Sequence, residues 1–199
     1  MENSENDFSP QQSLQLIESM INRAKDKFAE DGSMYLLWGW LVFICSLSQF
    51  TLLHIVQYSK HYIVWLATLP AFVYQFFYIR KKRKRQTVTT YTDSIIGYVW
   101  LTFCIVIILI GFLIGFLTGG DYYYYITPLL LAVYGVPVFL TGIIARFRSL
   151  VTGGIACWIL CIVSTLIKNY DYQFLMIPAA MLIAWIIPGY MLRAKYKSQ

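Results

Sequence analysis

The chain has 199 residues, of which 58% are hydrophobic and only 13% are charged, and its formal net charge is +6. A soluble domain of this length has no interior large enough to bury so much apolar surface, so the composition excludes an ordinary soluble fold. The apolar residues form uninterrupted blocks, and about 20 such residues cross a bilayer as a helix. We therefore predict an all-α, polytopic membrane protein.

Residues 1–32 predict a polar cytoplasmic tail that contains one amphipathic helix. Ser9 and Pro10 are typical of a helix start and Gly32 of an end, which bounds the helix at about residues 10–31. Its apolar stripe, spaced by three and four residues, includes Leu14, Ile17, Ile21 and Phe28. This stripe either lies on the membrane or pairs with a second copy or another protein. Because the first thirty residues lack the apolar core of a cleavable signal peptide, we expect the first span to direct insertion.

Six hydrophobic blocks predict a six-helix transmembrane bundle over residues 33–192, followed by a basic tail, 193–199. The spans are expected at about residues 34–56, 61–79, 94–117, 125–145, 150–167 and 174–192. The fifth block is short and contains Gly153 and Gly154, so we expect it to be tilted, shifted or kinked.

Glycine and tryptophan recur with a period near 58 residues, in the first, third and fifth blocks. The recurring residues are Gly39, Gly97 and Gly154, with Trp40, Trp100 and Trp158. This pattern predicts three helical hairpins of the same orientation, with duplication and chance recurrence as alternative origins.

Basic residues are distributed very unevenly between the two sides of the predicted bundle. One side holds 14 of the 16 Lys and Arg residues, and only Lys60 and Lys168 fall on the other. Short loops with this bias stay in the cytoplasm, so we predict that both termini are cytoplasmic. The densest run consists of Arg80, Lys81, Lys82, Arg83, Lys84 and Arg85. We expect this run to set topology and to contact anionic lipids of the inner leaflet, or alternatively an acidic partner, rather than nucleic acid.

No pattern in the sequence predicts a catalytic, cofactor-binding or metal site. The four cysteines lie in hydrophobic blocks and are expected to pack as small apolar residues. His54 and His61 flank the first outer turn, where anchoring at the membrane interface is favoured over a metal pair. Asp, Glu, Lys and Arg are absent near the middle of the predicted spans, which disfavours a proton-coupled pump.

Four uncharged residues within the spans are candidates for helix contacts. Gln49 and Gln75 are expected to hydrogen-bond between helices, with a substrate site as the alternative. Gly111 and Gly115, four residues apart, would let another helix approach closely.

The stretch Ser13 to Phe50 carries the one family resemblance. The helix Leu14-Gln15-Leu16-Ile17-Glu18-Ser19-Met20-Ile21 leads into Tyr35-Leu36-Leu37-Trp38-Gly39-Trp40-Leu41, and the whole resembles a family of uncharacterised bacterial six-span inner-membrane proteins. The resemblance implies a bacterial plasma membrane and no known activity. Two functions remain open. We favour a non-enzymatic scaffold or regulatory component that acts through its cytoplasmic helix and basic loops, and the alternative is a small-solute or lipid transporter.

Overall fold

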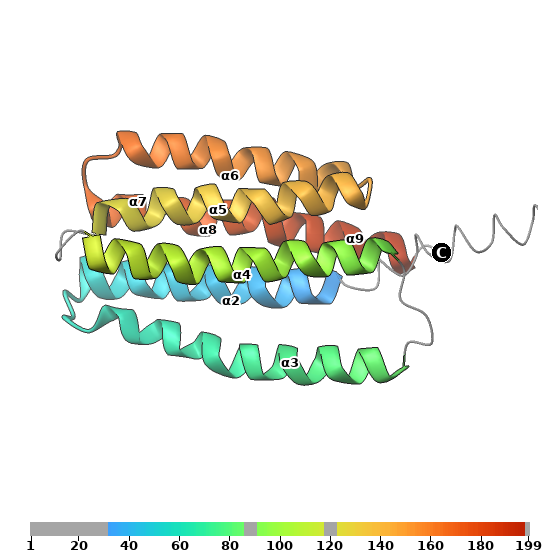
Figure 1. Ribbon diagram of the computed structural model, residues 1–199. Helices are drawn as coiled ribbons and strands as arrows, with labels where there is room; N and C mark the ends of the chain where they lie inside the picture. The colour runs from blue at the N-terminus through green and yellow to red at the C-terminus, as the bar shows by residue number, and fades with distance from the viewer. Residues whose placement is uncertain (1–31, 86–90, 118–122, 198–199) are drawn as a thin grey trace, which may run out of the picture.

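The computed structural model describes residues 32–85, 91–117 and 123–197 (Figure 1). These residues are helical and contain no strand. Six of the helices are long and apolar enough to cross a membrane, so the predicted all-helical class is confirmed and each predicted span has a matching helix. They cover Gly32–Ile55, His61–Lys81, Tyr91–Leu117, Tyr124–Ile144, Arg148–Leu166 and Tyr170–Lys195. The predicted tail helix, with Leu14, Ile17, Ile21 and Phe28, lies outside the described residues.

The first four spans contain two departures from regular α-helix. In the first span, α2 (Gly32–Phe50) ends in the π-helical turn η1 (Thr51–Ile55). In the second, the 3-10 helix η2 (His61–Ala67) continues into α3 (Thr68–Arg85). The third and fourth spans are α4 (Tyr91–Leu117) and α5 (Tyr123–Ile144), and α5 continues through both of its prolines.

The fifth span, α6 (Arg148–Leu166), is a continuous α-helix. Its glycine pair allows close packing. A Cβ added at Gly153 would lie 2.8 Å from Cα of Ala184, and one added at Gly154 would lie 2.6 Å from Cβ of Phe139. The absence of a side chain at these two positions therefore lets α6 approach two neighbouring helices closely.

The last span is the most interrupted of the six. It consists of α7 (Tyr170–Gln173), α8 (Met176–Met181), the π-helical turn η3 (Leu182–Ile186) and α9 (Ile187–Lys197). Pro188 has no amide hydrogen to donate to the carbonyl of residue 184, and the wider η3 turn ends two residues before it.

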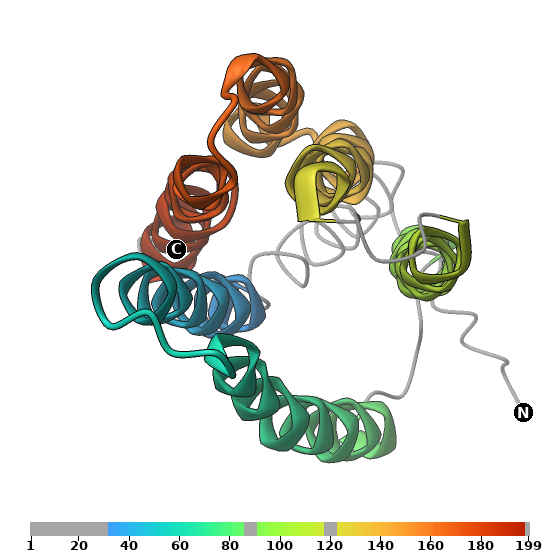
Figure 2. The same ribbon diagram turned by 90° about the vertical axis from the view of Figure 1, so that its left-hand side faces the viewer.

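The six spans form a ring when viewed along their axes (Figure 2). Around the ring, α2 packs on the last span, which packs on α6, and α6 packs on α5 over the most extensive helix contact. This pair crosses the boundary between two predicted hairpins. The helices α3 and α4 follow each other in sequence but stand apart in space, because α3 packs mainly on α2 and η2, whereas α4 packs mainly on α5.

The core lies along the last span. Ile177, Ala180, Met181 and Ala184 are at most 1% exposed, and 56% of the residues in the most apolar stretch of this span are buried. None is buried in the corresponding stretches of the second and third spans. The bundle therefore has a well-packed side, formed by α2, α5, α6 and the last span, and a loosely packed side, formed by α3 and α4.

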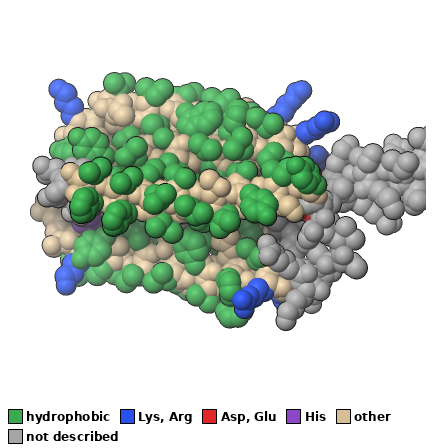
Figure 3. Space-filling view, viewed as in Figure 1, with side chains coloured by type: hydrophobic (Ala, Val, Ile, Leu, Met, Phe, Trp, Pro, Cys, Tyr) green, Lys and Arg blue, Asp and Glu red, His purple; other side chains and the backbone are tan. Residues whose placement is uncertain are grey.

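Hydrophobic side chains cover the middle of the molecule, and Lys and Arg side chains stand at its two ends (Figure 3). Such an apolar belt is the surface that a lipid bilayer would solvate. It agrees with a multi-pass membrane protein.

Candidate functional site

Gln49, one of the two predicted intramembrane polar residues, joins the first two spans. It is 4% exposed on α2, and its side-chain oxygen accepts a hydrogen bond from Nε1 of Trp65 on η2. Its amide nitrogen lies 3.0 Å from Nδ1 of His61. A third link joins the same elements, because the thiol of Cys45 donates to the backbone carbonyl of Val64 at 3.5 Å. Every polar atom of the Gln49 side chain thus contacts the neighbouring helix.

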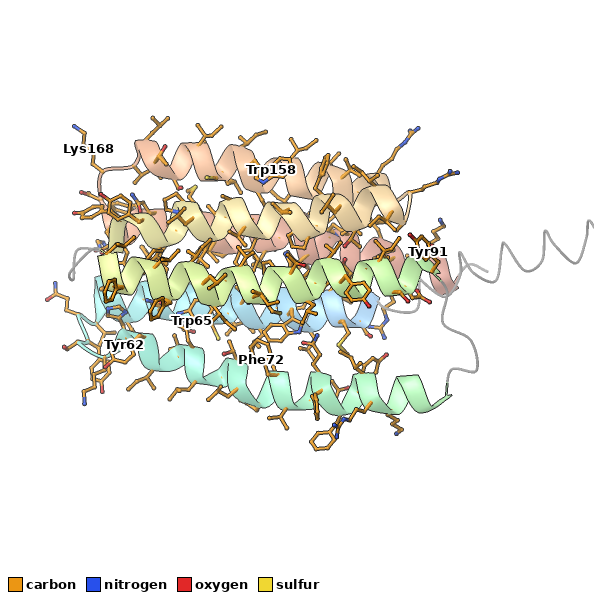
Figure 4. The ribbon with its side chains drawn as sticks, viewed as in Figure 1. Tyr62, Trp65, Phe72, Tyr91, Trp158 and Lys168 are labelled. Carbon is orange, nitrogen blue, oxygen red and sulfur yellow. The ribbon has the colours of Figure 1, made fainter. Side chains whose placement is uncertain are left out.

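Gln75 makes the corresponding contact nearer the other end of the same helix pair. Its oxygen accepts a hydrogen bond from Nε1 of Trp38 at 2.7 Å, and Trp38 also meets the ring of Phe72 at 4.7 Å between centroids. Figure 4 shows Trp65 and Phe72 along this hairpin. Two tryptophan–glutamine pairs therefore hold the antiparallel helices, and the tryptophan donor lies on the second span in one pair and on the first span in the other. This geometry agrees with the predicted role of Gln49 and Gln75 in contacts between helices.

Gly111 and Gly115, predicted to pack a helix, have no atom within 4 Å of an added Cβ, and the same is true of Gly97. All three belong to α4 and are exposed. The glycines of α2, α5 and α6 contrast with them, since Gly39, Gly135, Gly142, Gly153 and Gly154 each abut a neighbouring helix. The close approach predicted at Gly111 and Gly115 is therefore absent within the described part of the chain.

The basic end of the molecule gathers side chains from three segments. Arg80 and Lys81 lie near the end of α3, Arg146 and Arg148 lie at the turn between α5 and α6, and Arg193 lies on α9. The guanidinium of Arg80 lies 4.2 Å from the centre of the Phe76 ring. The side chains of the rest of the run, Lys82, Arg83, Lys84 and Arg85, lie outside the described residues.

The opposite end carries a contact that the sequence patterns did not predict. Nδ1 of His54 on η1 lies 3.1 Å from Oδ2 of Asp171 on α7, and both side chains are partly exposed. The His54 ring stacks on Phe50 at 5.4 Å between centroids and meets Tyr172 at 5.5 Å. His54 and Asp171 are 117 positions apart in the sequence, so no local spacing could have revealed their pairing. The only available clue was that His54 flanks the first outer turn and that Asp171 follows Lys168, which falls on the same predicted side.

An apolar groove runs between α4 and α5. It has a volume of about 340 Å³ and is lined only by hydrophobic residues and one tyrosine, namely Ile110, Leu113, Ile114, Leu117, Tyr125 and Leu129. The groove lies among exposed residues of two of the apolar helices and is open at the surface of the bundle. An acyl chain is the chemistry that such a lining fits.

The cysteines and the metal-ligating residues form no centre within the described ranges. The four cysteines are free thiols, and Cys161 donates to the carbonyl of Pro128 at 3.2 Å. No group of three or more His, Cys, Asp or Glu side chains is placed to hold a metal ion in residues 32–85, 91–117 and 123–197.

Comparison of the chain with protein-family models, with curated proteins and with solved structures finds no match. The resemblance of residues 13–50 to a bacterial inner-membrane family therefore stays a prediction.

Proposed function

We propose that this chain is a non-enzymatic component of the bacterial inner membrane, with both termini in the cytoplasm, that scaffolds or regulates a protein partner. The contacts to that partner come from the amphipathic segment 10–31 and from the basic loops, while anionic lipids of the inner leaflet surround the basic residues. The bundle serves as the anchor that holds these elements at the membrane.

The hydrogen bonds that Gln49 and Gln75 accept from tryptophan support this proposal over solute transport. A transported polar solute needs polar groups within the membrane that it can contact in place of water. Both glutamines instead accept hydrogen bonds from tryptophan N–H groups on the facing helix. Their chemistry is used for assembly, which leaves the basic end as the more suitable surface for recognition.

The test is a crosslinking pull-down from native membranes. We expect deletion of residues 9–31 to abolish co-purification of a specific partner while the bundle still inserts. The pair Arg80→Gln and Lys81→Gln should weaken co-purification, whereas Lys60→Gln and Lys168→Gln, which remove the same charge at the opposite end, should leave it unchanged. An identical set of captured proteins in all variants would contradict the proposal.

The groove between α4 and α5 favours lipid transport as a second candidate. Its apolar lining fits an acyl chain, and most of the residues that line it are exposed. In reconstituted vesicles, Leu113→Trp should fill the groove and slow the exchange of a fluorescent phospholipid between leaflets. The matched control is Ile108→Trp on the same helix, since Ile108 is 70% exposed and does not line the groove. Exchange no faster than in empty vesicles would reject this candidate.

A further inference from the structure

The two histidines of the chain lie at the end of the bundle opposite the basic loops, and each makes a different kind of hydrogen bond. His54 on η1 faces a carboxylate, whereas His61 on η2 faces an uncharged amide. Histidine is the side chain whose charge changes between pH 5 and 8. The two contacts should therefore respond differently when this end of the molecule is acidified.

The carboxylate of Asp171 defines how the His54 ring is bonded. An ionised carboxylate can only accept hydrogen bonds, so Nδ1 of His54, at 3.1 Å, must carry the hydrogen. Protonation adds a hydrogen at Nε2 and makes the existing bond a charge-assisted one, which is shorter and stronger. The stacked ring of Phe50 adds a favourable contact with the resulting cation. Acid therefore strengthens the contact between η1 and α7.

His61 is bonded in the opposite sense. The Nε1 group of Trp65 can only donate, so it must face the oxygen of Gln49, and this orients the amide nitrogen of Gln49 toward His61. Nδ1 of His61, at 3.0 Å, then has to accept a hydrogen bond and must carry no hydrogen. A protonated ring has hydrogens on both nitrogens. Acid therefore breaks the hydrogen bond between His61 and Gln49, which is one of the three links between η2 and α2.

Titratable side chains lie beside both histidine rings. Among the described residues, Asp171 and Tyr172 contact the His54 ring, and Tyr62 meets the His61 ring. The cations at this end are Lys60, next to His61 in sequence, and Lys168, which Figure 4 shows at the same end as Tyr62.

We propose that this end of the bundle is an acid-sensitive coupling, in which protonation strengthens the contact of η1 with α7 through His54 and weakens the contact of η2 with α2 through His61, while the Trp65–Gln49 and Cys45–Val64 links remain. The element that is loosened, η2, continues into α3, and the basic run 80–85 lies at the far end of α3. A change in pH at one face of the membrane thereby loosens the segment that carries the basic run at the other face.

The first test is histidine NMR of the full chain without a histidine tag. With labelled histidine at pH 8, the nitrogen shifts should show one neutral ring with hydrogen on Nδ1 and the other with hydrogen on Nε2. His54→Gln assigns the signals by removing the first. Two rings with the same tautomer would overturn the proposal, and this result needs no variant to be stable.

The second test compares thermal unfolding of the purified chain at pH 8 and pH 5.5. The double variant His54→Gln/His61→Gln provides the baseline for all other titrating groups. Relative to it, His61→Gln should gain about 2–4 °C in Tm on acidification, because only the His54 contact responds, and His54→Gln should lose a similar amount. Adding Asp171→Asn to His61→Gln should remove the gain. Changes of the same sign in both single variants, or a gain that survives Asp171→Asn, would refute the coupling.

Discussion

Glycine has two different structural roles in this chain, and the difference lies in what faces each residue. At Gly154 an added Cβ would meet the backbone of Phe139, with its Cα and its nitrogen both at 2.9 Å, so α5 and α6 touch there almost without side chains. At Gly111 the same atom would meet nothing within 4 Å. A Gly→Ala substitution at each of these two positions therefore separates the effect of packing on stability from the effect of helix propensity.

We expect Gly154→Ala to destabilise the folded bundle by about 1–3 kcal/mol, since the new methyl group must push a backbone away in a close-packed contact. Gly111→Ala should be neutral or should stabilise by up to about 1 kcal/mol, because alanine favours helix and nothing opposes it. Thermal unfolding in detergent measures both. Equal shifts in Tm for the two variants would show that α5 and α6 do not approach as described.

The glycines also show how far the sequence alone could predict the contacts. The spacing of Gly111 and Gly115 is the most recognisable packing pattern in the chain, yet within the described residues both face open space. Close contacts occur instead at Gly39, Gly135, Gly142, Gly153 and Gly154, none of which lies four residues from another glycine. Periodicity within one helix identifies a flat surface, but it does not specify which helix lies opposite. That information depends on the arrangement of the whole ring.

At the scale of elements, α3 is the least firmly held of the six spans. No residue in its most apolar stretch is buried, and its contacts are concentrated on α2, through Trp38, Phe72 and Gln75. Without a hydrophobic drive between helices in lipid, such polar contacts carry much of the association. The blocks of apolar residues predicted this helix, but not its separation from α4, because the order of helices around the ring depends on contacts distant in sequence.

A double-mutant cycle tests how α3 is held. Trp38→Phe and Gln75→Leu should each destabilise the bundle, and their coupling should be about 0.6 kcal/mol, the average for hydrogen bonds between membrane helices. Tyr74→Phe provides the control on α3, since Tyr74 is 53% exposed and is stacked on Tyr78 of its own helix. Additive effects of Trp38→Phe and Gln75→Leu in thermal unfolding would mean that their hydrogen bond does not hold the helix.

At the scale of the whole molecule, the two ends differ strongly in charge. Of the described Lys and Arg side chains, Lys60 and Lys168 lie at the end with the two histidines, and the others lie at the opposite end. The antiparallel helices bring together basic residues that are far apart in sequence, including Arg80, Arg146 and Arg193. The sequence predicted this segregation because charge bias depends only on the alternation of loops, and six spans preserve that alternation.

Six crossings and this charge bias predict one definite orientation in the cell. The variants Ser59→Cys and Ala194→Cys place a thiol at an exposed position at opposite ends, and neither changes a charge. A membrane-impermeant maleimide added to intact cells should label Ser59→Cys and not Ala194→Cys, and inverted vesicles should reverse the result, because short basic loops stay in the cytoplasm. The unsubstituted chain is the control, since its four cysteines lie within the spans. Labelling of both variants from the same side would mean that the chain crosses the membrane an even number of times between residues 59 and 194. The predicted six spans, and with them the cytoplasmic assignment of the basic end, would then be wrong.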